Sequence, residues 1–132
     1  MDIGQAPYFE LLRIRLDQLS QRQRLIAENI ANASTPGYTP RDLDASAFQR
    51  ALDAQSGVAL ARTNAGHMAA GGAPQAVIVT RADSETTLDG NAVVLEEQTV
   101  RAAETRMQYE TALALYQKGL QLLRMASRPP GR

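Results

Sequence analysis

The sequence predicts a mainly α-helical protein, in which long N- and C-terminal helices pair as a coiled-coil-like hairpin and a long irregular middle segment joins them. Three observations predict this fold class. Apolar residues recur at heptad-like spacing near both ends of the chain. Hydrophobic residues make up 44% of the sequence and aromatic residues only 5%, without Trp, which favours an aliphatic helical core over a β-sandwich. Between the two ends, Gly and Pro interrupt regular patterns.

The first helix is expected from about Pro7 to Ala33, since a proline is tolerated in the first turn of a helix. Apolar residues follow one another there at intervals of three and four, interrupted only where Gln23 occupies an expected apolar position. We assign this stripe to pairing with the C-terminal helix. Its members are Leu12, Leu16, Leu19, Ile26 and Ile30.

A turn is expected directly after this helix. Pro36 cannot continue a helix and biases Thr35 toward an extended conformation. Pro36 followed by Gly37 is typical of a type II turn, in which the glycine supplies the positive φ. Asn29 and Asn32 lie three positions apart near the helix end, where their amides could bind the freed carbonyls or the turn. The alternative is that both amides are exposed.

The middle segment, about residues 34–92, shows little periodicity. A short helix near 45–55 and a short strand at 76–80 are plausible. The chain between them is broken by Gly66, Gly71, Gly72 and Pro74. We therefore expect this segment to be mobile or ordered only by its neighbours, within a single domain that spans residues 1–132.

The second long helix is expected at about residues 93–127, after a turn at Asp89-Gly90-Asn91. Its pairing seam follows intervals of four and three, and Val100, Ala103 and Met107 form an adjoining stripe. The seam consists of Tyr109, Leu113, Tyr116, Leu120 and Leu123. Leu115 and Leu122 lie outside the seam and are assigned to contact with a neighbouring subunit, because the middle segment has too few apolar residues to cover both helices.

The composition excludes several classes of function. Fourteen basic residues balance fourteen acidic residues, so no net charge attracts nucleic acid or an anionic membrane. The absence of Cys excludes disulfides, a thiol nucleophile and Cys-ligated metals. The N-terminus lacks the basic start and apolar run of a signal peptide, and no stretch is apolar enough to span a membrane.

The residues that could carry chemistry have simpler interpretations. His67 is the only histidine and is best explained as an ordinary loop residue. The carboxylate pairs Asp42 with Asp44, and Glu96 with Glu97, are best explained as solvated charges near helix starts. Gly71-Gly72 lacks the other parts of a phosphate loop. We therefore expect no enzymatic activity, no catalytic, cofactor or metal site, and no small-molecule substrate.

Residues 29–38 resemble the signature of flagellar rod, hook and hook-associated proteins. The matching residues are Asn29, Ile30, Ala31, Asn32, Thr35, Pro36, Gly37 and Tyr38. Residues 41–44, 62–68 and 89–97, together with 108–110, extend the resemblance toward the rod proteins.

The resemblance implies a structural subunit of the proximal rod of the bacterial flagellar basal body, which polymerises through its terminal helices and helps to transmit torque for motility. The implied partners are other rod proteins, further copies of the chain, the basal-body adaptor and membrane ring, and the flagellar type III export apparatus. The implied location is the periplasmic rod, reached without a cleaved signal peptide. Two alternatives stay open: the neighbouring rod protein that shares the N-terminal signature, and a cytosolic helical binding or chaperone-like protein.

Overall fold

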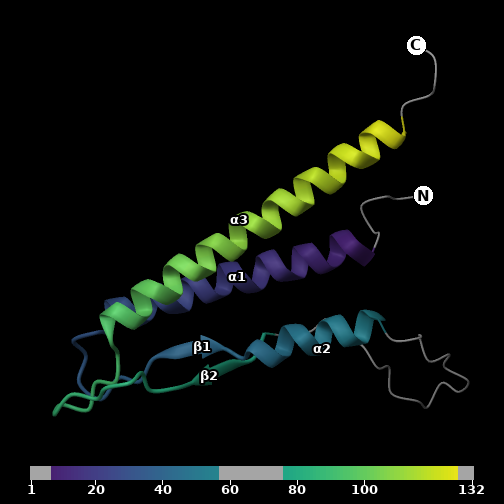
Figure 1. The fold of residues 1–132 in the computed structure, drawn as a ribbon. Helices are drawn as coiled ribbons and strands as arrows, with labels where there is room; N and C mark the ends of the chain where they lie inside the picture. Colours follow the sequence, from purple (N-terminus) through teal and green to yellow (C-terminus); the bar gives the residue numbers. More distant parts are fainter. Residues whose placement is uncertain (1–6, 57–75, 128–132) are drawn as a thin grey trace, which may run out of the picture.

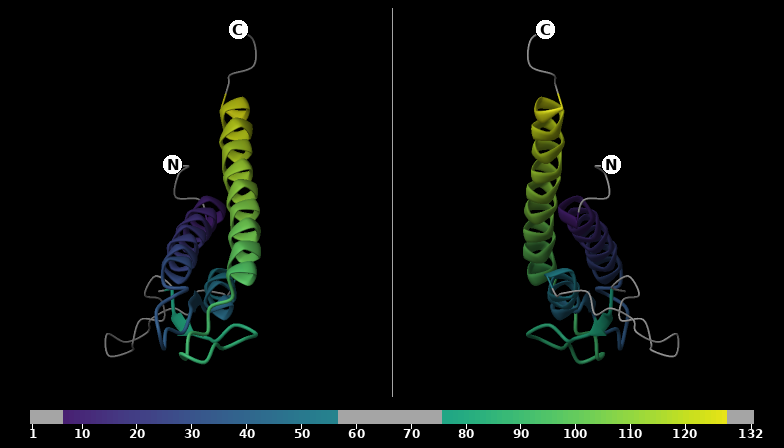
Figure 2. Two further views of the ribbon diagram at one scale, coloured as in Figure 1. Left: turned by 90° about the vertical axis from the view of Figure 1, so that its left-hand side faces the viewer. Right: turned by 90° about the vertical axis from the view of Figure 1, so that its right-hand side faces the viewer.

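Two long antiparallel helices form the main body of the structure (Figure 1). The computed structural model describes residues 7–56 and 76–127. Helix α1 spans Pro7–Ala31 and α3 spans Leu95–Ala126, within two residues of the expected bounds. They pack side by side, which confirms the expected helical hairpin. The last turns of α3 extend past the start of α1 (Figure 2).

A small antiparallel sheet and a short helix lie beside the pair of long helices and contact α1 (Figure 2). Strand β1 (Arg41–Leu43) pairs with β2 (Ile78–Thr80), with Asp42 opposite Val79. Helix α2 (Ala45–Ser56) matches the expected short helix, and β2 lies within the expected strand. Strand β1 was not expected from the sequence. The described parts of the middle segment therefore hold one more regular element than expected. Residues 57–75, with His67 and Gly71-Gly72, lie outside the described part of the chain.

The pairing of α1 and α3 begins with an aromatic cluster near the start of α1. Phe9 is buried and makes edge-to-face contacts with Tyr8 and Tyr116, each with ring centroids 5.3 Å apart. Gly119 gives these rings room, because a Cβ atom there would lie 3.0 Å from ring carbons of both Tyr8 and Phe9. The Tyr8 hydroxyl also donates a hydrogen bond to the backbone oxygen of Leu115, at 3.3 Å.

The buried face of α3 consists of small and polar residues. Gln98, Thr105 and Ala112 are buried and lie seven residues apart, and Gly119 continues the series. Residues seven positions apart share one side of a helix, and small side chains there let a neighbouring helix approach closely. The expected seam residues of α3 flank this series and are each half-buried: Tyr109, Leu113, Tyr116, Leu120 and Leu123.

On α1, the buried face shifts along the helix. Leu19 and Ile26 are buried, and Leu12 and Leu16 are half-buried. Ile30, which was assigned to the same stripe, is 40% exposed. Near its C-terminal end, α1 packs on both α3 and β1, so that Leu25 and Asn29 take the buried positions there. The stripe therefore does not continue to the end of α1.

Candidate assembly site

The side chain of Asn29 lies at the junction of α1, β1 and α3. It is 1% exposed, and all four of its hydrogen-bonding positions are used. The amide nitrogen donates to the Arg41 carbonyl at 2.8 Å and to Gln98 Oε1 at 3.0 Å. The amide oxygen accepts from the Arg41 N–H at 2.9 Å and from the Tyr38 hydroxyl at 3.1 Å. The interpretation of Asn29 as an exposed amide is therefore wrong.

Gln98 extends this network to an ion pair at the start of α3. Its amide nitrogen donates to Asp83 Oδ2 at 2.9 Å, and the Val94 N–H donates to the same oxygen at 2.9 Å. Arg101 donates to Asp83 Oδ1 at 2.7 Å. Burial of the Asp83 carboxyl would raise its pKa, but the hydrogen bonds from Gln98, Val94 and Arg101 and the charge of Arg101 outweigh burial and lower the pKa.

The turn after α1 adopts the geometry expected from its Pro-Gly sequence. Gly37 has a φ of 72°, and the Tyr38 N–H donates to the Thr35 carbonyl at 3.2 Å. The Asn32 side chain donates to the Glu28 carbonyl at 2.8 Å, which is the bond to a freed helix carbonyl that the sequence suggested.

This turn binds the loop that precedes α3. The Gly37 N–H donates to the Asp89 carbonyl at 2.9 Å, and the Ala92 N–H donates to the Tyr38 carbonyl at 2.9 Å. The buried side chain of Asn91 donates to the carbonyls of Asn32 and Thr35, at 2.9 and 2.7 Å. The signature residues therefore join the end of α1 to the approach to α3. Two other signature residues, Ile30 and Ala31, are exposed, as is Pro36.

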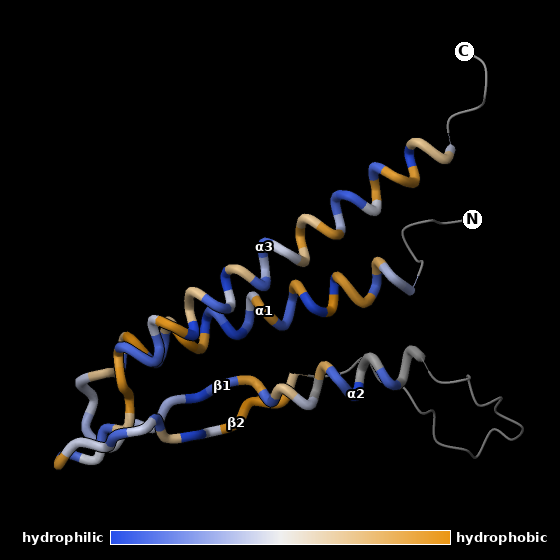
Figure 3. The backbone as a smooth tube through the Cα atoms, viewed as in Figure 1, coloured by the Kyte–Doolittle hydropathy of each residue, from blue (hydrophilic) through white to orange (hydrophobic). Residues whose placement is uncertain are grey.

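The outer face of α3 carries exposed apolar residues. Leu115 is 47% exposed and Leu122 is 54% exposed. Val100, Met107 and Met125 are also exposed and lie on the same side of the helix. Figure 3 shows apolar residues up to the end of α3, beyond the turns that α1 covers. Where this face meets the edge of the helix contact, Met107 and Leu115 border an open groove of about 630 Å³, together with Leu12 and Ala112.

Three of the four carboxylates in these pairs bind neighbouring groups in the structure. Asp42 accepts two hydrogen bonds from the Arg22 guanidinium, at 2.8 and 2.9 Å, and both side chains are partly buried. This pairing was not expected from the sequence. Asp44 caps α2 through the Ser46 N–H and hydroxyl, at 3.0 and 2.7 Å. Glu97 accepts from Arg101 and from Ser84. Glu96 is exposed, as expected.

Two structural findings concern membranes and metals. Among the helices of the described residues, none combines the length and apolar character that crossing a membrane requires. Within residues 7–56 and 76–127, no three His, Cys, Asp or Glu side chains gather in a way that could hold a metal ion.

Comparison with known proteins places these features in a family. Residues 13–39, which end within the Pro-Gly turn region, match the family described as flagella basal body rod protein. The flagellar basal body rod protein FlgB of Escherichia coli (strain K12) is 38% identical over 106 residues, covering 75% of this chain and 77% of that protein. The chain belongs to the FlgB family of flagellar basal body rod proteins.

Other FlgB proteins show the same relationship. The protein of Cereibacter sphaeroides is 41% identical over 96 residues, which cover 71% of this chain and 73% of that protein. The protein of Salmonella typhimurium (strain LT2) is 34% identical over 107 residues, which cover 76% and 78%. These matches favour a structural rod subunit of the FlgB type over the neighbouring rod protein FlgC and over a cytosolic helical binding or chaperone-like protein.

Proposed function

We propose that the chain, as a single domain, polymerises within the proximal rod through α1 and α3, with Leu115 and Leu122 at the contact between subunits. In this proposal, the expected pairing residues of both helices, apart from the exposed Ile30, hold each subunit together. The rod then transmits torque through contacts between successive helix pairs.

The outer face of α3 is the observation that carries this proposal. Leu115 and Leu122 are about half exposed, although each is a large apolar side chain on an ordered helix. Burying a fully exposed leucine side chain contributes roughly 1.5–3 kcal/mol, so burying the exposed half of each of these would stabilise a contact by roughly 1 kcal/mol. A contact between two different faces of the same chain can repeat without closing into a ring, and its repetition then builds an open filament.

The other partners and the location are proposed from family membership. A subunit at the base of a rod meets other rod proteins, the basal-body adaptor and the membrane ring. It reaches the periplasm through the flagellar type III export apparatus without a cleaved signal peptide. In support of passage through a narrow channel, the helices cover only part of their apolar surface within one chain, so neighbours are needed for full burial.

The test is complementation of a strain from which the gene has been deleted. Leu115→Asp and Leu122→Asp should leave the circular dichroism of the purified chain nearly unchanged, because both side chains are already exposed. Each should abolish incorporation into basal bodies, since a buried charge without a partner is strongly unfavourable. Gln117→Asp is the matched control, because Gln117 is exposed on α3 outside the apolar stripe. Normal swimming of both leucine variants would contradict the proposal.

A further inference from the structure

The loop before α3 exposes a leucine at its tip. Leu88 is fully exposed, with a relative accessibility of 110%. Its neighbours Glu85 and Asp89 are exposed acids, and residues 84–91 contain no basic residue. Figure 3 shows this apolar tip on a mostly polar loop at the lower left of the molecule. We call residues 84–91 the Leu88 loop.

The Leu88 loop is held in a fixed shape by its own hydrogen bonds. The Thr87 N–H donates to the Asn91 carbonyl at 2.8 Å, and the Gly90 N–H donates to the Thr87 carbonyl at 2.9 Å. The Asp89 carboxylate accepts from the Thr87 hydroxyl and the Asn91 N–H, and these bonds lower its pKa. The Gly37 N–H also donates to the Asp89 carbonyl, which anchors the loop to the turn after α1. The leucine is therefore presented to solvent by an ordered support, which limits the entropy that binding would cost.

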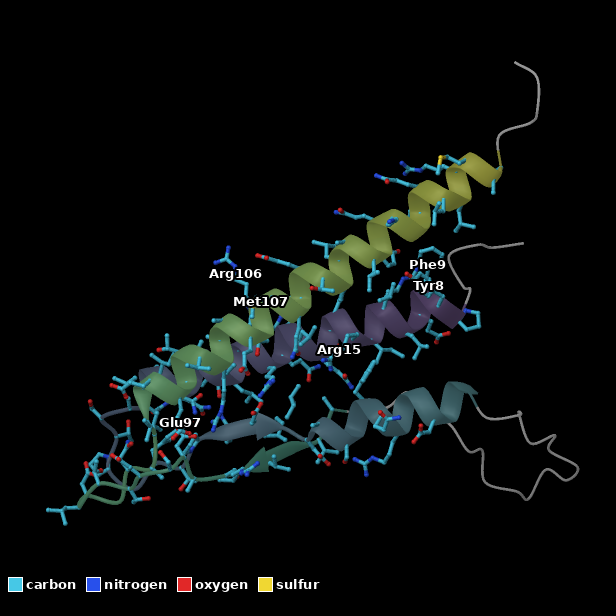
Figure 4. All side chains as sticks on the ribbon, in the orientation of Figure 1. Tyr8, Phe9, Arg15, Glu97, Arg106 and Met107 are labelled. Carbon is cyan, nitrogen blue, oxygen red and sulfur yellow. The ribbon has the colours of Figure 1, made fainter. Side chains whose placement is uncertain are left out.

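A cleft of about 530 Å³ between α1, α2 and the sheet has complementary chemistry. Leu43, Phe48 and Val79 give it an apolar wall. Its charged lining residues are Arg15, Arg22, Arg81, Asp42 and Asp44, so the positive charges outnumber the negative ones by one. We call it the Arg15 cleft. Arg15 lies between α1 and α2 (Figure 4), where its guanidinium donates to Gln108 Oε1 at 3.0 Å and lies 4.7 Å from the centre of the Phe48 ring.

The positive charges of the cleft are only partly compensated. Arg22 is paired with Asp42, and Asp44 bonds to Ser46 and Arg50. Within the described residues, neither Arg15 nor Arg81 contacts a carboxylate. Burial and the nearby Arg22 lower the pKa of Arg15, which shows that its charge lies in an unfavourable environment. A carboxylate brought into the cleft would stabilise that charge.

We propose that the Leu88 loop of one copy of the chain inserts into the Arg15 cleft of the next copy. Leu88 then packs against the apolar wall of the cleft. Glu85 and Asp89 then face Arg15 and Arg81. The loop lies at one end of the molecule, and the cleft lies between α1 and α2 (Figure 1), so the contact joins two different surfaces and can repeat without closing. This inference rests on the proposed polymerisation and names a second contact within it.

The absence of Cys from the whole chain permits a clean cross-linking test. Cells lacking the gene would produce two full-length variants together, one with Leu88→Cys and the other with Val79→Cys. Because each chain then carries one thiol, a dimer that combines the two variants requires contact between copies within disulfide range. In isolated basal bodies this pair should yield about tenfold more mixed dimer than Leu88→Cys with the exposed Gln117→Cys, since adjacent groups have high effective concentrations.

A substitution at the loop tip gives a second readout. Leu88→Asp should leave the circular dichroism of the monomer unchanged, because Leu88 has no contact to lose, but should greatly reduce incorporation into basal bodies. Thr86→Asp, at an exposed position of the same loop, should assemble normally.

The possible failures are distinguishable. If both Cys variants enter basal bodies and support swimming without mixed dimers, the inference is overturned and the proposed function stands. Protection of Val79→Cys from maleimide without cross-linking would assign the cleft to another segment or protein, which also overturns the inference. Absence of even the unsubstituted chain from basal bodies would instead refute the proposed function.

Discussion

Asn29 of α1 binds both backbone polar groups of Arg41 in β1, donating to its carbonyl at 2.8 Å and accepting from its N–H at 2.9 Å. The Asn29 side chain thus makes the pair of backbone hydrogen bonds that a neighbouring strand would make at the edge of β1. The same amide reaches Gln98, so the sheet and both long helices meet at one residue.

Asn29→Ala should destabilise the purified chain by about 1–3 kcal/mol, because it leaves the buried Gln98 oxygen and the Arg41 backbone groups without their partner. Urea denaturation followed by circular dichroism measures this loss. Asn32→Ala is the control, since Asn32 is less buried and its side chain makes only two local hydrogen bonds, one to the Glu28 carbonyl and one from the Thr35 hydroxyl. Equal losses for the two variants would show that the network does not act as a unit.

Replacement of Gly37 should separate backbone strain from side-chain size. A Cβ at Gly37 would meet nothing within 4 Å, so only its φ of 72° opposes substitution. Gly37→Val should therefore cost about 1–3 kcal/mol and impair assembly by misplacing the loop before α3. Gly37→Asn should be much milder, because Asn tolerates positive φ. The two variants can be compared by urea denaturation and by swimming of the complemented strain, and a fully active Gly37→Val would contradict the turn assignment.

Acid should weaken the junction at Asp83. Its pKa is lowered in the folded chain, so its ionised form contributes stability above the ordinary Asp pKa of about 3.9, and that contribution is lost as the pH falls below this value. Asp83→Asn should therefore reduce stability at pH 7, and the difference from the original chain should shrink in acid. Asp17→Asn, at an exposed carboxylate of α1, should show little difference at either pH.

Thermal or urea unfolding across pH 2–7 would measure the difference in stability between the original chain and each variant. This range includes the reference pKa of Asp, about 3.9. Asp44 and Asp89 also have lowered pKa values, from hydrogen bonds with Ser46 and Thr87 respectively, so all variants should lose some stability in acid. The comparison with Asp83→Asn isolates one carboxyl. If the stability difference between the original chain and Asp83→Asn stays constant down to the lowest pH, the Asp83 pKa is not lowered in the folded chain.

Gly119→Val should destabilise the helix pair by about 1–3 kcal/mol, because its side chain would collide with the ring of buried Phe9. Ala114→Val, at an exposed position of the same helix, is the matched control and should cost only about 0.5 kcal/mol through helix propensity. Near-ultraviolet circular dichroism of the aromatic cluster and urea denaturation would measure both effects. If Gly119→Val matches its control, close approach of the helices at this point is unimportant.

The long helices could be predicted because their heptad-like stripes and terminal prolines are local signals. Strand β1 could not, because three residues, Arg41–Leu43, become a strand only by pairing with Ile78–Thr80 far along the chain. The end of the α1 stripe was also misplaced at Ile30. The reason is that β1 packs on α1 there and draws Leu25 and Asn29 inward.

The polar junction was missed because amide side chains are usually exposed, and no apolar pattern marks their burial. One signal was present: Gln98, Thr105, Ala112 and Gly119 recur every seven residues on α3. None of these four residues is large and apolar, so the pattern of large apolar residues does not mark the series, although it forms the centre of the helix contact. The signature residues near Gly37 were recognised by resemblance, whereas their bonds to the loop before α3 depend on the folded chain.

The two sets of bonds at Asn29 differ in the length of the chain loop that each one closes. Arg41 is 12 positions away and Gln98 is 69 positions away, so forming the second contact costs roughly 1.5 kcal/mol more in loop-closure entropy. Pulsed hydrogen exchange during refolding should accordingly find the Arg41 amide protected before those of α3. A growing chain emerging from the ribosome can make the short-range contact early, but cannot build the paired helices until α3 has been synthesised. The proposed contact surface between subunits is therefore absent until α3 has left the ribosome.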